Sequence, residues 1–314
     1  RLDGVGPVPA ERERPKTAQH ADLMAHPDLV DMIARRVGGL SWFDRVLPPA
    51  AIGPVAYGNR APLERDLKNL QAACARHQVA EAFINSASPG VLTKFVPNLH
   101  YASEDAYVEA LVEALRPEYE AIVDAGFILQ IDAPDFGSAR HNQYQDLDEA
   151  AFLKIAERNV EALNHATRNI AADRMRMHIC WGNYEGPHTH DIPLAALHPV
   201  VTRARPAGLL IEGANPAHAH EVEDLKRLGL PDDKVLLPGV IDTTTNFVEH
   251  PTLVAQRITA WADAVGRERV IASTDCGFAT FAGPANPVAP SVVWQKLGAL
   301  AEGAARATDR LWGK

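Results

Sequence analysis

Two cysteines, a histidine and a glutamate occur where short apolar runs of the sequence end, and all four are zinc-ligand types. His178 and Cys180 are two residues apart on a predicted strand, so their side chains point to the same side. Cys276 closes the last predicted strand, and Glu212 closes another and can offer an oxygen as the fourth ligand. One such cysteine alone would be interpreted as a small buried hydrophobic residue. Together the four residues predict a zinc site.

A zinc site with two thiolates and a carboxylate is net negative, which makes it poor at generating hydroxide for hydrolysis. Such a site can instead bind an incoming thiol and lower its pKa, holding it as a thiolate at neutral pH. The sequence therefore predicts alkyl transfer to a small-molecule thiol, with Zn²⁺ as the cofactor.

The loop after the predicted zinc-binding strand is unusually polar, with His188, His190 and Asp191 at its far end. These three residues could form a second metal site. Without strand context, we favour a solvated loop or one that shapes the substrate pocket. Trp181 and Asn183, at the start of the loop, are the candidate substrate-binding residues.

Three further residues of metal-binding type receive no ligand role. Cys74 lies inside a helical pattern without ligand companions, so we expect it to be a core residue. His218 and His220 lie two residues apart at the start of a predicted helix, on different faces, and we expect both at the surface.

The candidate ligands need strands that end at one edge of a sheet. Short β-rich runs alternate with amphipathic helices along the chain. Strands are predicted over 83–86, 127–132, 175–180, 208–212, 235–241 and 270–275, and helices over 104–124, 149–170, 217–228, 251–266 and 291–308. Apolar strands separated by helices indicate a parallel sheet, whose active site forms at the carboxyl ends of the strands. Asp132 and Asp242 also lie at this edge.

Six strand–helix units follow residue 81, which fits an open doubly wound sheet or part of an eight-stranded barrel. No Gly-x-Gly-x-x-Gly follows a strand, and no Gly-x-x-x-x-Gly-Lys-Ser/Thr is present. We therefore predict an α/β protein, a (β/α)₈ TIM barrel whose first two units are absent from this chain. We expect the missing strands upstream or on another chain, because six units alone would expose two sheet edges.

The predicted domain organisation is a single catalytic barrel over 1–314, with 1–60 an irregular N-terminal segment. Within that segment, the run Ile52–Tyr57 could be an accessory strand or hairpin.

Composition limits the partners. The formal charge is −9 without a Lys/Arg run, which argues against nucleic acid or an anionic membrane. The apolar stretches fall far short of the roughly 18 residues of a membrane span, and no signal peptide opens the chain. Three cysteines make no disulfide framework, so we expect a cytoplasmic protein. The expected partners are a small thiol and a methyl or alkyl donor, and a homo-oligomer is compatible with the sequence.

Several motifs together resemble the zinc-binding half of cobalamin-independent methionine synthase over residues 81–314. They are His178-Ile-Cys180, Ile211-Glu212, Pro238-Gly-Val-Ile-Asp242 and Thr274-Asp-Cys276-Gly277. The resemblance implies a (β/α)₈ barrel in which zinc activates a thiol for methyl or alkyl transfer. It also implies His178, Cys180, Glu212 and Cys276 as the zinc ligands and Asp132 and Asp242 as catalytic residues, with Asp132 holding the amino group of homocysteine.

The chain departs from the family pattern at informative positions. Ala133 stands where the family has a glutamate, and Thr244 replaces its catalytic histidine. Both changes weaken the case for folate-dependent methionine synthesis. The sequence after Cys180 is more similar to a single-domain branch that includes the epoxyalkane:coenzyme M transferases. Two N-terminal motifs of the family that help bind the thiol, one His-x-Gly-Ser-like and one Asp-Gly-Glu, are not found.

Methyl transfer to homocysteine or a related thiol is our first functional hypothesis, and thiol opening of an epoxide is the alternative within the same family. A metal-free decarboxylase on a related barrel is a further alternative, but no arginine falls at a predicted strand end to grip a carboxylate. A non-catalytic barrel that keeps zinc for structure would have a closed four-ligand site that thiols do not change.

Overall fold

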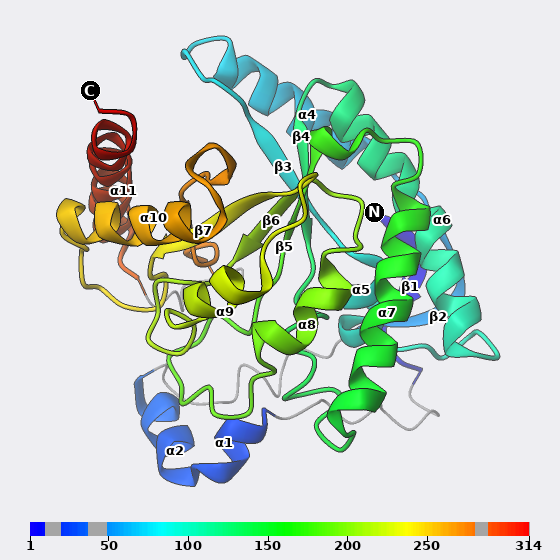
Figure 1. Ribbon diagram of the computed structural model, residues 1–314. Helices are drawn as coiled ribbons and strands as arrows, with labels where there is room; N and C mark the ends of the chain where they lie inside the picture. Colours follow the sequence, from blue (N-terminus) through cyan, green and yellow to red (C-terminus); the bar gives the residue numbers. More distant parts are fainter. Residues whose placement is uncertain (10–19, 37–48, 280–287, 314) are drawn as a thin grey trace.

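A sheet of parallel strands forms the centre of the molecule (Figure 1). The computed structural model describes residues 1–9, 20–36, 49–279 and 288–313. The strands of this sheet are β3 (Phe83–Ala87), β4 (Ile128–Asp132), β5 (Met175–His178), β6 (Gly208–Ile211), β7 (Val235–Ile241) and β8 (Ser273–Thr274). They pair in chain order, each parallel to the one before. A doubly wound sheet reverses its strand order at a switch point, so this unreversed order confirms the barrel-type fold.

Helices cover the outer face of the sheet and connect its strands. They are α5 (Pro89–Phe95), α6 (Glu104–Asp124), α7 (Glu149–Ala166), α8 (Leu194–Val201), α9 (Glu221–Leu228), α10 (Pro251–Val265) and α11 (Pro290–Trp312). Ser103 caps α6, because its hydroxyl accepts a hydrogen bond from the Ala106 N–H. The short helix α8, which contains Pro199, was not expected. Among the described residues, no helix has both the length and the apolar character of a membrane span.

One main core joins the sheet to the helices. Its fully buried members include Leu129 and Ile131 of β4, Phe152 of α7 and Met177 of β5. Residues of the strands alternate between the helix-covered face and the interior of the curve, and both sides are largely apolar. The polar side chains therefore gather beyond the carboxyl ends of the strands, where the apolar layers stop.

The N-terminal part of the chain is more regular than the sequence predicts. Strand β1 (Leu2–Gly6) pairs antiparallel with β2 (Ala50–Tyr57), which confirms the expected accessory strand. Helices α1 (Ala21–Ala25), α2 (Pro27–Arg36) and α4 (Ala61–Cys74) complete this region. The interpretation of 1–60 as an irregular segment is wrong for these described parts. The strand pair is stabilised because β2 packs on α6 through a second apolar cluster, which includes Val55, Tyr107 and Leu111.

The pair α1–α2 lies apart from the β1–β2 sheet, at the lower edge of Figure 1. Asp22 of α1 is fully buried and accepts hydrogen bonds from Tyr184 and Thr189 of the loop after β5. An early segment of the chain is thereby fixed against the end of the sheet that carries the candidate ligands.

Candidate metal centre

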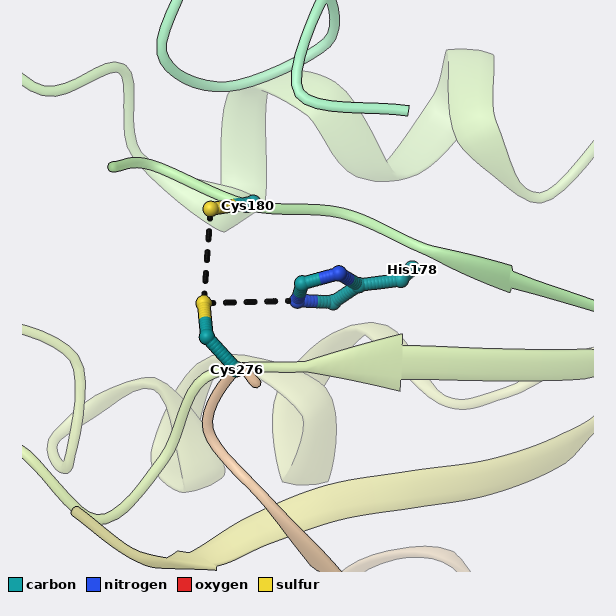
Figure 2. A group of neighbouring side chains, drawn as sticks. All are labelled: His178, Cys180 and Cys276. Atoms are coloured by element: carbon teal, nitrogen blue, oxygen red, sulfur yellow. Dashed lines mark hydrogen bonds between the residues drawn. The ribbon is translucent and has the colours of Figure 1, made fainter. Parts of the chain in front are cut away.

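Three of the four predicted ligands meet at the carboxyl ends of β5 and β8 (Figure 2). The Sγ atoms of Cys180 and Cys276 are 3.3 Å apart, and the Sγ of Cys276 lies 3.5 Å from Nε2 of His178. All three side chains are buried. These separations are shorter than two metal–ligand bonds laid end to end, at about 2.3 Å for Zn–S and about 2.0 Å for Zn–N. One zinc ion can therefore reach all three atoms.

The strands that carry these ligands are shorter than predicted. Strand β5 ends at His178, so Cys180 lies just beyond it, and Cys276 lies two residues beyond β8. Backbone hydrogen bonds continue past both strand ends, from the Ile179 N–H to the Leu210 carbonyl and from the Asp275 N–H to the Ile241 carbonyl. The Gly182 N–H also donates to Cys180 Sγ at 3.3 Å.

Glu212, the fourth predicted ligand, follows β6 and is buried beside the two thiols. Its Oε1 lies 3.8 Å from Cys276 Sγ and accepts a hydrogen bond from the Trp181 N–H at 2.8 Å. Its Oε2 accepts from Nδ2 of Asn215 at 2.8 Å. The carboxylate is thus fixed from two sides and needs only a small shift to join the other three donors.

Asp275 holds the end of β6 against the end of β8. Its Oδ1 accepts hydrogen bonds from the N–H groups of Gly213 and Ala214 at 2.9 and 2.8 Å, and its Oδ2 accepts from Asn215. These donors directly follow Glu212, and Asp275 directly precedes Cys276. The sequence marks Asp275 only as part of a motif, whereas the structure shows that it positions two candidate ligands at once.

The electrostatics of this group favour a cation. Burial raises the pKa of Glu212 to about 7. The pKa of Cys276 is raised well above its ordinary value by its hydrogen bond with Cys180, by burial and by nearby negative charge. Burial lowers the pKa of His178, but its hydrogen bond to Asp132 and the negative groups nearby outweigh this and raise it to about 9. Without a cation these groups keep their protons, whereas a divalent ion would allow all donors to bind in their metal-binding forms. The donor set fits Zn²⁺.

The family profile described as "Cobalamin-independent synthase, Catalytic domain" matches residues 89–289, which include all four candidate ligands. The chain belongs to this family. The match to the synthase family also spans β4 to β8, the strands at whose ends the candidate ligands gather.

Two known proteins are similar to this synthase-family chain. A curated 2-hydroxypropyl-CoM lyase from Xanthobacter autotrophicus is 26% identical over 212 residues, which cover 59% of this chain and 52% of the lyase. The match thus spans about half the length of that relative. A solved B12-independent methionine synthase from Shewanella sp. W3-18-1, in complex with selenomethionine, aligns over 100% of this chain and 78% of that chain. Its TM-score is 0.69 at 19% identity, which shows that the fold is shared.

Asp132, the last residue of β4, reaches the candidate metal centre through its contact with His178. Its Oδ1 lies 2.9 Å from Nδ1 of His178, on the side of the ring away from the thiols. Metal-bound histidines commonly donate their other N–H to a carboxylate, which fixes the ring and its tautomer. The side chain of Asp132 is still 47% exposed, so it can also face a bound substrate.

The two predicted substrate-binding residues of the loop after β5 have different environments. Trp181 is fully buried, and its indole N–H donates to the Ile192 carbonyl at 2.6 Å. Asn183 is half-buried and joins three loops, because it donates to the Gly277 carbonyl and accepts from the Thr243 hydroxyl. Asn183 therefore lies among the loops at the carboxyl ends of β5, β7 and β8, whereas Trp181 supports Glu212 from within.

Asp242 follows β7 and holds its own loop. Its carboxylate accepts hydrogen bonds from Thr244 and Thr245, which outweigh the effect of burial and lower its pKa, so it stays ionised at neutral pH. Thr244 stands where the resemblance led us to expect a catalytic histidine, and in the structure it serves to fix this acid.

Two residues near the site were missed or misplaced by the sequence analysis. His218 is 3% exposed and bonded to Asp191, so the expectation that it lies at the surface is wrong; His220 is exposed, as expected. Lys94 of α5 was not considered. Its Nζ donates to Ser138 at 2.9 Å, and burial lowers its pKa to about 8 despite the nearby Cys180 and acidic groups. The sequence signal that could have identified Lys94 was its position in the helix directly after β3, at the carboxyl end of that strand.

Proposed function

We propose that this chain carries the active site of a zinc-dependent thiol alkyltransferase. The observation that supports this most directly is the buried convergence of two thiols, an imidazole and a carboxylate at the strand ends. His178, Cys180, Cys276 and Glu212 would hold the ion. Zn²⁺ held by two thiolates would lower the pKa of an incoming thiol and present it as a thiolate at neutral pH.

The names of the similar proteins agree with this chemistry. The curated relative is a lyase of 2-hydroxypropyl-CoM, and the solved methionine synthase is in complex with selenomethionine. Both handle a carbon bonded to sulfur or selenium. In the proposed reaction the thiol loses its proton, a sulfur–carbon bond forms, and the bond between that carbon and its leaving atom in the donor breaks.

The surroundings of the site suggest the form of the thiol. Lys94 is half-buried and supplies an ammonium whose electrostatic neighbours include Cys180, Asp132 and Asp135. A cation at this position would pair with an acidic tail on the substrate, such as the carboxylate of homocysteine or the sulfonate of coenzyme M. Asp132, half-exposed at the same edge, would bind an ammonium group if the thiol carries one. We therefore propose a small thiol with an acidic tail as the acceptor.

Two reactions remain candidates. The first is methyl transfer to homocysteine or a related thiol, which the resemblance to the methionine synthases suggests. Ring opening of an epoxide by the thiol is the second, and the match to the 2-hydroxypropyl-CoM lyase supports it. In that case the ring carbon–oxygen bond breaks and the oxygen takes a proton. We propose that Asp242 acts in either reaction by fixing the loop of Thr244 and Thr245.

Zinc analysis and zinc-edge X-ray absorption, with and without homocysteine or coenzyme M, test the proposal. A zinc ion with sulfur ligands, and a further sulfur ligand on adding one thiol but not the other, would identify the acceptor. The Cys276→Ser variant should lose the sulfur-bound zinc together with activity, whereas the matched Cys74→Ser variant should keep both. Absence of sulfur-bound zinc would favour the metal-free decarboxylase, and an unchanged four-ligand site would favour a structural role.

A further inference from the structure

A second group of buried imidazoles and carboxylates lies beside the candidate metal centre. It is formed by the end of the loop after β5 and the turn before α9. Nδ1 of His188 and Nε2 of His218 lie 2.7 and 3.0 Å from the same oxygen of Asp191. One ligand atom of each residue lies within 4.8 Å of the other two. Residues 30 positions apart in the chain thus bring two ring nitrogens and a carboxylate to one point.

The outer ring nitrogens of both histidines face an oxygen. Nε2 of His188 lies 3.1 Å from the Tyr184 carbonyl, within hydrogen-bond distance, whereas Nδ1 of His218 lies 3.4 Å from Oε2 of Glu221 and has no hydrogen-bond partner among the described residues. A histidine that binds a metal through one nitrogen usually directs the other N–H to a carbonyl or carboxylate. Each ring is therefore already oriented with its inner nitrogen toward Asp191.

A third imidazole points at this group without any hydrogen bond. The side chain of His141 is 0% exposed, and neither of its nitrogens has a hydrogen-bond partner among the described residues. Its Nδ1 lies 3.4 Å from Oδ1 of Asp191, an oxygen that also lacks one. Buried polar groups are rarely left without a partner, and an ion among these groups would satisfy them.

The loop holds His188 in an uncommon backbone conformation. Its φ of 55° lies in the left-handed region, which costs free energy for a residue with a side chain. The next residue, Thr189, is anchored by Asp22 of α1 through its N–H and its hydroxyl. The surrounding contacts thus keep His188 turned toward Asp191.

The group is open to solvent ions on one side. His141 and Asp191 line a cavity of about 450 Å³, together with Arg140, Thr189 and His190. On the other side it adjoins the candidate zinc site through Trp181. The Trp181 ring lies 4.5 Å from the ring of His218, and its backbone N–H binds Glu212. An ion could enter from the cavity without passing through the first site.

We propose that His188, Asp191 and His218 form a second binding site for a divalent transition-metal ion, with His141 beside the other oxygen of Asp191. Imidazole nitrogens with one carboxylate suit Zn²⁺ and its first-row neighbours and disfavour Mg²⁺ and Ca²⁺. This site contains no thiolate, so it is chemically distinct from the site of His178, Cys180 and Cys276. It gives the polar loop after β5 a role that the proposed alkyl transfer does not need.

Cobalt(II) titration separates the two sites, because only thiolate ligands give an intense near-ultraviolet sulfur-to-cobalt absorption. The wild-type chain should bind about two equivalents of Co²⁺, one of them with this absorption. The Cys180→Ser/Cys276→Ser variant should still bind about one equivalent, visible only through weak d–d bands. Adding His188→Gln to that variant should abolish the remaining binding, and His220→Ala, which changes an exposed histidine nearby, should not.

The inference is overturned if the Cys180→Ser/Cys276→Ser variant binds no more Co²⁺ than the same variant with His188→Gln. Asp191→Asn serves as a second ligand variant of nearly unchanged shape, and circular dichroism shows whether each variant folds. If both ligand variants fold and keep the second equivalent, the group is a hydrogen-bond network without an ion. Because binding is measured without turnover, this outcome leaves the proposed alkyl transfer untouched.

Discussion

The ring of His178 has a partner on each side at the candidate metal centre. Its Nε2 faces Cys276 Sγ at 3.5 Å and its Nδ1 faces Asp132 at 2.9 Å, so the ring is fixed between a ligand and a carboxylate. The carboxylate orients the ring and would raise the basicity of Nε2 toward a metal bound there.

The Asp132→Asn variant tests this role. An amide can still accept a hydrogen bond from Nδ1 but has no charge, so we expect zinc affinity at the thiolate site to fall about 10- to 100-fold. Competition with a chromophoric chelator measures the change. The matched control is Asp124→Asn at the exposed end of α6, which should leave the affinity unaltered. Equal affinities in both variants would show that Asp132 does not act through His178.

The raised pKa values of the site predict that zinc binding releases protons. The pKa of His178 is raised to about 9 and that of Glu212 to about 7, and the pKa of Cys276 is also raised, so the metal-free site holds protons at pH 7. Metal ligands bind in deprotonated form, so affinity should fall as the pH falls from 9 to 6. Calorimetric titration in buffers of different ionisation enthalpy counts the released protons. A binding enthalpy that does not depend on the buffer would contradict this expectation.

The elements of the sheet place these residues through very close approaches. A Cβ at Gly239 of β7 would lie 2.0 Å from Oδ1 of Asp275 and 2.7 Å from its Cα, so glycine is the residue that lets β7 and β8 meet here. Asp275 in turn holds the end of β6 next to Glu212. The position of two candidate ligands therefore depends on the spacing of three neighbouring strands.

Gly239→Ala should accordingly move β8 away from β7. Overpacking of this kind typically costs about 1–3 kcal/mol of stability, and we expect zinc affinity to fall as well, because Cys276 follows Asp275 directly. Urea unfolding and zinc competition measure the two effects. Gly277→Ala at the same edge is the matched control, since its Cβ would meet nothing within 4 Å. If the two variants behave alike, the close approach does not position the site.

The arrangement of strands and loops determines how much of the fold and of the candidate site the sequence could predict. Strand periodicity places Asp132, His178, Glu212 and Cys276 at one sheet edge, because parallel strands end together. The surroundings of His218 could not be predicted, because its partner Asp191 comes from a different loop. Strand β1, the partner of the expected accessory strand β2, was missed for a similar reason: the two strands are more than 40 residues apart, and β1 contains Gly4, which is unfavourable in strands.

At the scale of the whole molecule, the candidate zinc ligands join elements from distant parts of the chain. His178 and Cys180 belong to β5 and its loop, Glu212 follows β6, and Cys276 follows β8. An ion bound by all four would link these strands in the folded state only, because the unfolded chain lacks the preformed site. Zinc should therefore stabilise the entire sheet and not only its edge.

Thermal unfolding with and without zinc tests this coupling. Free zinc at about 1,000 times the dissociation constant adds roughly 4 kcal/mol to the free energy of unfolding. At about 2–4 °C per kcal/mol for large domains, Tm should rise on the order of 10 °C. Chelator should reverse the shift, and Cys74→Ser should retain it. The Cys180→Ser/Cys276→Ser variant should lose most of the zinc-induced rise in Tm. Adding His188→Gln to that variant should remove the remainder. If His188→Gln alone removed the whole rise in Tm, the stabilising ion would be bound by the group of His188, Asp191 and His218. The cysteine thiolates would then not stabilise the sheet through zinc.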